Sequence, residues 1–175
     1  IMVAAELVSQ GKADAFISAG NSGATMAASL WHLRRLPGVS RPAIATLMPT
    51  LVGNAIVLDV GANVDCKPKH LLQFAVMGSI YAHAILNIPS PRVGLLTIGE
   101  EEGKGNLVTV ETHPMLKASG LNYVGHVEGR DVRRECVAWQ HCMAYQCLQQ
   151  TLFQATLQRF TDQSFELFPP DVVLY

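Results

Sequence analysis

Residues 93–98 form a short apolar run, VGLLTI, which stops abruptly at Gly99. A run that is apolar on both faces is typical of a strand buried on both sides, as in a parallel sheet. The loop that follows, GEEEGKGN, places three glutamates and Lys104 on a flexible glycine backbone. Because ligands of open α/β sheets bind beyond the carboxyl ends of the strands, this loop is the first candidate for a functional site.

The order of strand, glycine loop and helix recurs along the chain. The predicted strands are residues 14–19, 43–47, 56–60, 93–98 and 121–124, and the predicted helices are residues 2–10, 24–35, 69–86 and 108–119. Pro49 is expected to close the second strand, and Pro114 to interrupt the last helix. The alternation predicts a doubly wound α/β sheet, whose loops open on one edge at Gly20, Gly61, Gly99 and Gly125.

Composition narrows the class of protein. The 175 residues are 49% apolar and only 15% charged, so one domain with a sizeable core is expected. The net charge of −1 gives no reason to expect a nucleic-acid partner. The sequence has no apolar run of membrane-spanning length and no basic leader, which predicts a soluble cytoplasmic protein. The four cysteines match no standard zinc spacing, so no metal is expected.

The pattern changes after residue 132. All fourteen glycines lie between Gly11 and Gly129, whereas residues 133–175 contain three of the four cysteines and several glutamines. We therefore interpret residues 1–132 as an α/β domain and residues 133–175 as a separate tail, helical or poorly ordered. The tail is expected neither to join the sheet nor to supply a site residue.

The loop at residues 99–106 resembles a phosphate-binding P-loop but departs from it. Only three residues separate Gly99 from Gly103-Lys104, and Gly105 occupies the place of the magnesium-binding Ser or Thr. This argues against ATP hydrolysis. Two interpretations stay open: the backbone amides and Lys104 hold a smaller anion, or the loop is a solvated acidic turn.

Other motifs also have two interpretations. Gly20-Asn21-Ser22-Gly23 is close to a nucleophile elbow, but Ala24 stands where the second glycine belongs, so Ser22 is predicted to be a helix N-cap. Arg130 has the bidentate geometry that suits phosphate, or it pairs with Glu128 or Asp131. His113 and His126 have no evident serine or cysteine partner, which argues against a catalytic triad.

Five segments in order resemble the PlsX family of bacterial phosphate acyltransferases over residues 3–132. They are GKADAFISAGNSGA, RPAIA, LDVGANVDCKPKHLLQFAVMG, PRVGLLTIGEEEGKGN and YVGHVEGRDV. The resemblance implies a three-layer α/β/α sandwich, Rossmann-like and similar to phosphotransacetylases and isocitrate dehydrogenases, of which this chain is an incomplete part. It also implies a homodimer.

The activity implied by the resemblance is transfer of a long-chain fatty acyl group from acyl carrier protein to inorganic phosphate, without metal or cofactor. The acyl phosphate would pass to a glycerol-3-phosphate acyltransferase in phospholipid synthesis, and peripheral membrane contact is implied. The implied catalytic residues are Lys104, Asn106 and Asn63. The implied phosphate or substrate contacts are Gly20, Asn21, Ser22, Gly23, Gly61, Asn63, Gly99, Lys104, Gly105, Asn106 and Arg130. The alternatives are an inactive phosphate- or nucleotide-binding fragment and, more remotely, a hydrolase that uses Ser22.

Overall fold

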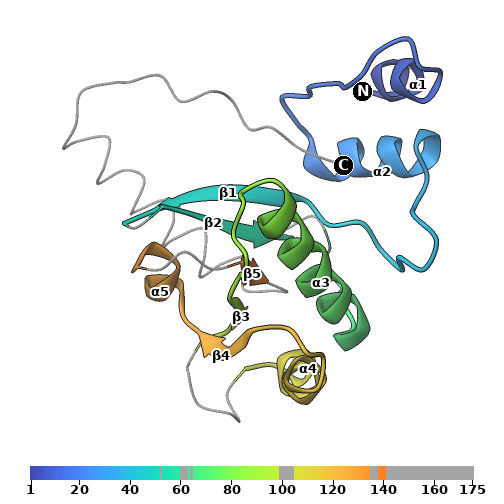
Figure 1. The fold of residues 1–175 in the computed structure, drawn as a ribbon. Helices are drawn as coiled ribbons and strands as arrows, with labels where there is room; N and C mark the ends of the chain where they lie inside the picture. Colours follow the sequence, from blue (N-terminus) through green and yellow to red (C-terminus); the bar gives the residue numbers. More distant parts are fainter. Residues whose placement is uncertain (52, 60–62, 64, 99–104, 135–137, 141–175) are drawn as a thin grey trace.

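The computed structural model describes residues 1–51, 53–59, 63, 65–98, 105–134 and 138–140. Within these residues five strands form one sheet in the order β1-β2-β5-β3-β4 (Figure 1). The strands are β1 (Ala45–Thr50), β2 (Gly53–Leu58), β3 (Val93–Leu96), β4 (Tyr123–Val127) and β5 (Ala138–Gln140). β2, β5, β3 and β4 are parallel, so their carboxyl ends share one edge, which we call the carboxyl edge. β1 is antiparallel to β2.

The described helices are α1 (Met2–Ser9), α2 (Ser22–His32), α3 (Pro68–Ala84), α4 (Leu107–Lys117) and α5 (Gly129–Arg134). Alternate residues of β2 point to opposite faces of the sheet. Ile56 and Leu58 pack in one core cluster with Leu71 and Phe74 of α3. Ala55 and Val57 belong to a second cluster, which includes Val132 of α5. The sheet therefore lies between α3 and α4 on one face and α5 on the other, and the expected α/β/α layering is confirmed.

The helix predictions are confirmed with shifted ends. α3 begins at Pro68, where the missing N–H costs no hydrogen bond. Pro114 does not interrupt α4, which continues to Lys117. The loss of one helical hydrogen bond at Pro114 is offset by packing, because Thr112 and Leu116, on either side, are fully buried. Pro49 likewise lies inside β1, whose position at the sheet edge tolerates a missing donor.

Two sequence predictions are wrong, one about a strand and one about a glycine loop. Residues 14–19 form no strand; Ile17 is 81% exposed, and the flanking helices α1 and α2 make their principal contacts with each other, away from the sheet (Figure 1). An apolar segment becomes a strand only when another strand pairs with it, and no described strand pairs with this one. Gly125 is not in a loop but inside β4, where its φ of 103° accompanies a register shift against β3.

The expectation that nothing after residue 132 joins the sheet is also wrong. β5 lies between β2 and β3 and pairs in parallel with both. Neighbouring strands of a continuous sheet must lie close enough to form hydrogen bonds with each other. Residues 138–140 occupy the position between β2 and β3 and complete the sheet there. Residues 141–175 lie outside the described part of the chain, so the remaining interpretation of the tail stays a prediction.

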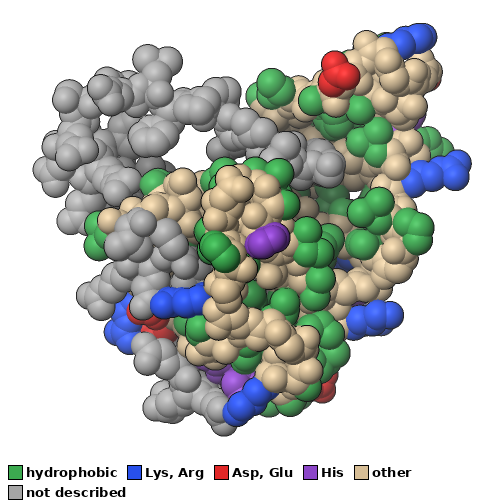
Figure 2. Space-filling view, in the orientation of Figure 1, with side chains coloured by type: hydrophobic (Ala, Val, Ile, Leu, Met, Phe, Trp, Pro, Cys, Tyr) green, Lys and Arg blue, Asp and Glu red, His purple; other side chains and the backbone are tan. Residues whose placement is uncertain are grey.

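Charged side chains are sparse on the face shown in Figure 2, where apolar groups cover much of the surface. This agrees with the low charged fraction of the sequence. None of the described helices is long and apolar enough to cross a membrane.

Candidate functional site

The carboxyl edge is best defined where β3 and β4 end. The Thr97 amide donates a hydrogen bond to the Val127 carbonyl over 2.9 Å, which holds the two strand ends together. Gly105 lies close to this point: a Cβ placed on it would be 3.7 Å from Cγ2 of Thr97 and 2.2 Å from Oγ1 of Thr109. Because its φ is also +119°, only glycine fits this position without strain. Gly105 is therefore tightly packed at the start of α4.

Asn106 is the N-cap of α4. Its Oδ1 accepts a hydrogen bond from the Thr109 amide over 2.9 Å, and the Thr109 hydroxyl donates to the Asn106 carbonyl over 2.8 Å. These bonds fix the Asn106 side chain by its oxygen, so its NH₂ group is the end that remains to donate to a ligand. The N-terminal end of an eleven-residue helix adds a positive partial charge.

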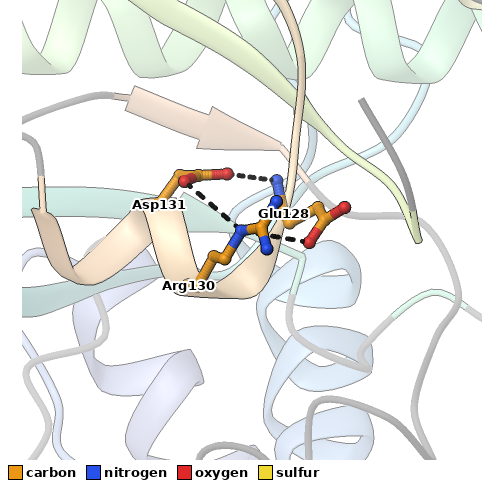
Figure 3. A network of polar contacts seen from close by, with 3 residues as sticks. All are labelled: Glu128, Arg130 and Asp131. Atoms are coloured by element: carbon orange, nitrogen blue, oxygen red, sulfur yellow. Dashed lines mark hydrogen bonds and ion pairs between the residues drawn. The ribbon is translucent and has the colours of Figure 1, made fainter. Parts of the chain in front are cut away.

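Arg130 lies in α5, just beyond the end of β4. β4 is the neighbour of β3 in the sheet. Its Nε is 3.3 Å from Oε2 of Glu128 and 4.0 Å from Oδ1 of Asp131 (Figure 3). Asp131 also accepts a hydrogen bond from the Glu128 amide over 2.9 Å, which closes the turn. The Arg130 side chain is 62% exposed, and exposed ion pairs contribute little free energy. A doubly charged phosphate is thus able to compete for the guanidinium.

Asn63 is held from three sides beyond the end of β2. Its Nδ2 donates to Oδ1 of Asp59 over 2.8 Å and to the Pro42 carbonyl over 3.1 Å, and its backbone amide donates to the same Asp59 oxygen over 3.0 Å. Both side-chain protons are therefore engaged. In this arrangement the Asn63 side chain can donate to a substrate only if one of these bonds breaks.

Asp59, which anchors Asn63, is 1% exposed and adopts a left-handed backbone conformation with φ of 63°. Its second oxygen, Oδ2, accepts a hydrogen bond from the Cys66 thiol over 3.4 Å. Burial raises the pKa of the Asp59 carboxyl above its ordinary value, although the hydrogen bonds from Asn63 and Cys66 and the charge of Arg41 oppose this shift. Asp59 is thus a buried acid in a structural network.

The predicted anion loop at residues 20–23 lies at the start of α2, whose principal contacts are with α1. The N-cap of α2 is Asn21, whose Oδ1 accepts from the Ala24 amide over 3.1 Å, and not Ser22, which is the first helical residue. Asn and Ser are both favourable N-cap residues. The helix was predicted to begin at residue 24, two residues after the observed start of α2, so the sequence did not single out Asn21 as the cap. A common site of Gly20, Asn21, Ser22 and Gly23 with Asn106 therefore stays a prediction.

Of the predicted site residues, three follow the ends of the neighbouring strands β3 and β4 at the carboxyl edge, namely Gly105, Asn106 and Arg130. Asn63 follows β2, which β5 separates from β3. Gly61, Gly99 and Lys104 lie outside the described residues. The sequence analysis missed Thr97 and Thr109, which surround Gly105, and Arg41, whose Nη1 donates to the Asp65 carbonyl over 3.0 Å. No motif marked these residues, because their contacts depend on the fold.

His113 and His126 serve the packing of α4 on β4. Their rings meet edge to face with centroids 4.7 Å apart, and Nδ1 of His113 lies 3.0 Å from the Tyr123 hydroxyl. A separate hollow of about 510 Å³ lies beyond the end of α2, lined by Leu30 and residues 34–39. None of the predicted site residues lines it.

Parallel strands that end beside the N-terminal ends of α3 and α4 define an α/β protein with a ligand-binding edge. The fold is similar to that of the EutD phosphotransacetylase from Staphylococcus aureus, with a TM-score of 0.58 and 17% identity, over 91% of this chain and 55% of that one. It is also similar to a phosphotransacetylase from Streptococcus pyogenes, with a TM-score of 0.62 and 16% identity, over 91% and 54% of the two chains. The expected fold class is confirmed.

Sequence comparison then identifies the family. The model of the fatty acid synthesis protein family matches residues 1–138, and the chain belongs to this family. It is 58% identical over 132 residues to the phosphate acyltransferases of Desulforamulus reducens and Elusimicrobium minutum. The matched part is 75% of this chain but only 40% and 39% of those relatives, so the chain spans well under half of their length.

Proposed function

We propose that the chain transfers a long-chain fatty acyl group from acyl carrier protein to inorganic phosphate, forming acyl phosphate for phospholipid synthesis. The structural observation that carries the proposal is the set of residues after β3 and β4 at the carboxyl edge: the tightly packed Gly105, the N-cap Asn106 held by its oxygen, and the exposed Arg130. Membership of the family supports the reaction, as does the name of the relatives. The group suits a small tetrahedral anion.

The reaction needs positioning more than acid–base chemistry. A phosphate oxygen attacks the thioester carbonyl, forming a C–O bond and a tetrahedral oxyanion; collapse of the oxyanion breaks the C–S bond, and the carrier thiolate leaves with that electron pair. Phosphate is already an anionic nucleophile at neutral pH. The main tasks of the protein are to hold phosphate against the thioester and to stabilise the oxyanion with fixed donors.

We assign these tasks to Arg130 and Asn106 at the carboxyl edge and, from the sequence, to Lys104. Lys104 and Arg130 neutralise the phosphate, while Asn106 and the amides of the turn donate hydrogen bonds to it. Asn63 acts indirectly, since its amide protons already bind Asp59 and Pro42. A part for Gly61 and Gly99, and for the turn at residues 20–23, stays a prediction.

The proposed partners follow from the same family. They are acyl carrier protein, a glycerol-3-phosphate acyltransferase that receives the product, a membrane surface contacted peripherally, and a second copy of the chain. The apolar side chains of Val76 and Ile80, 39% and 61% exposed, lie one turn apart on α3 and offer a surface for the second copy.

Phosphate binding measured by calorimetry tests the site. Lys104→Met and Arg130→Gln should each weaken binding by roughly 1.5–3 kcal/mol, as expected for a charged hydrogen bond. Arg34→Gln, which removes an exposed arginine beyond the end of α2, is the matched control and should bind like the wild type. Unchanged affinity in both test variants, on folded samples, would refute the assignment.

One alternative is supported by a specific observation. Because the chain spans about 40% of the length of its relatives, it is alternatively a fragment that binds phosphate or a nucleotide without catalysis. Phosphate binding without acyl-phosphate formation would favour this alternative. Ser22→Ala separates both from a hydrolase, since only a hydrolase that uses Ser22 would lose activity.

A further inference from the structure

A cluster of basic residues lies at the start of α3, on the same edge as the end of β2. Lys67 and Lys69 are exposed on either side of Pro68, while Arg41 and His70 are half-buried beside them. We call Arg41, Lys67, Lys69 and His70 the basic cluster. In a chain whose charged residues make up only 15%, this concentration of positive charge is unusual.

The cluster is held in place by hydrogen bonds from two segments. Arg41 donates to the carbonyl of Asp65, two residues before Lys67 in the chain, over 3.0 Å. The turn before Arg41 is fixed to α3 by Gln73, which accepts from the Ser40 amide and donates to the Gly38 carbonyl, each over 2.8 Å. The Lys67 amide donates to Nδ1 of His70 over 3.2 Å.

This arrangement is unfavourable for the helix itself. The N-terminal end of a helix is positive and normally attracts acidic residues, but the first turn of α3 contains none and has lysines at the N-cap and second positions. Burial lowers the pKa of His70, and the charges of Arg41, Lys67 and Lys69 lower it further. The nearby carboxylates are the buried Asp59, which opposes this shift, and the exposed Asp65. Sites that oppose local stability are often functional.

We infer that Arg41, Lys67 and Lys69 form the docking surface for an acidic protein, which brings its acyl group to the carboxyl edge. The identity of that protein rests on the proposed function, where it is acyl carrier protein. A protein surface fits better than a phosphate ion, because both lysines are exposed and the Arg41 guanidinium already binds a carbonyl. A membrane fits less well, since the exposed apolar residues Val76 and Ile80 lie about two turns or more beyond Lys69.

The test measures binding of the whole chain to purified acyl carrier protein at low and moderate salt. Lys67→Gln/Lys69→Gln should reduce the association rate constant at low salt by about tenfold and flatten its salt dependence, because charges at the rim of an interface steer encounter. Arg41→Gln should act in the same direction. The control Lys12→Gln/Lys117→Gln changes the net charge equally but at exposed sites in other parts of the fold, and it should leave the rate constant within about twofold of the wild type, since the steering field decays within about a Debye length.

Phosphate affinity measured by calorimetry and binding to anionic vesicles complete the experiment. Wild-type phosphate affinity in the double variant, together with slower carrier binding, is the expected result. Loss of phosphate affinity with normal carrier binding would assign the cluster to the phosphate site and overturn the inference. An effect on vesicle binding alone would also overturn it, as would an equal loss of carrier association rate in the control variant. If the wild type binds phosphate but not the carrier, the docking inference fails while the phosphate site stands; if it binds neither, the proposed function fails as well.

Discussion

At the residue scale, the buried Asp59 carboxyl links the end of β2 to Asn63 and Cys66. One oxygen receives two hydrogen bonds from Asn63 and the other receives one from Cys66. The carboxylate therefore holds Asn63 and Cys66 in place, but its burial raises its pKa. Ionisation of this group consequently has a cost in the folded protein that is absent from the unfolded chain.

This difference predicts a pH dependence of stability. The pKa of Asp59 is above 3.8 in the folded state, so between 3.8 and that higher pKa the folded state binds more protons than the unfolded state. The contribution of Asp59 to the free energy of unfolding should then fall as pH rises through this window. Asp59→Asn keeps an oxygen for Asn63 and cannot ionise. Its stability relative to the wild type should therefore improve as pH is raised from about 4 to 7, as measured by urea unfolding.

Cys66→Ala provides the matched control for this prediction. It removes the thiol hydrogen bond that lowers the pKa of Asp59 but leaves the carboxyl in place. The fall of stability with pH should persist in this variant. A difference between Asp59→Asn and the wild type that is the same at every pH would contradict the account.

Gly105 gives a second test at this scale. Gly105→Ala introduces a Cβ 2.2 Å from the Thr109 hydroxyl at a φ of +119°, so the turn into α4 must distort. The free energy of unfolding should fall by roughly 1–3 kcal/mol, the range for a residue held in an unfavourable backbone conformation. Gly129→Ala is the control, because an added Cβ meets nothing within 4 Å there, and its stability should stay within about 0.5 kcal/mol of the wild type. Equal effects of the two substitutions would be contrary to this explanation.

At the scale of elements, two substitutions of the N-cap residue of α4 distinguish its contribution to stability from its contribution to ligand binding. Asn106→Ala removes the acceptor for the Thr109 amide and should cost about 0.5–2 kcal/mol of stability. Asn106→Asp keeps the acceptor and should stay close to wild-type stability. It replaces the NH₂ donor by a carboxylate, so its phosphate affinity should still fall, as measured by calorimetry. Wild-type phosphate affinity in Asn106→Asp would remove Asn106 from the site.

Hydrophobic periodicity was enough to predict α1 to α4 and β1 to β4, but it predicted neither α5 nor β5. It failed where tertiary contacts decide the structure. The apolar pattern of residues 14–19 matches that of β3, but only β3 has strands on both sides. Nothing in the local sequence of residues 138–140 shows that the sheet has a place for them between β2 and β3.

The candidate site could be predicted only in part, because some of its hydrogen bonds depend on tertiary contacts. Glycine turns and polar residues after strands indicated Gly105, Asn106 and Arg130, because strand ends in a parallel sheet meet at one edge. The engagement of both Asn63 protons depends on the Pro42 carbonyl, 21 residues away in sequence. No spacing rule contains such a contact, so a residue type alone could not distinguish a substrate donor from a loop anchor.

At the scale of the whole molecule, the exposed apolar side chains of α3 predict self-association. Replacing Val76 and Ile80 by aspartate should shift the mass measured by light scattering from dimer to monomer, because two buried charges would lose their hydration without a partner. Val110→Asp, at an apolar residue of α4 with similar exposure, serves as the control. A wild-type chain that is monomeric at high concentration would be evidence against the dimer.

The most direct measurement of the central claim is acyl-phosphate formation by the whole chain. Purified protein is incubated with long-chain acyl carrier protein and inorganic phosphate, and acyl phosphate is trapped as the hydroxamate and quantified over time. The account predicts product that increases with protein and phosphate concentration and is strongly reduced in Arg130→Gln. No product from a folded sample that binds phosphate would contradict it and would leave the chain as a binding fragment.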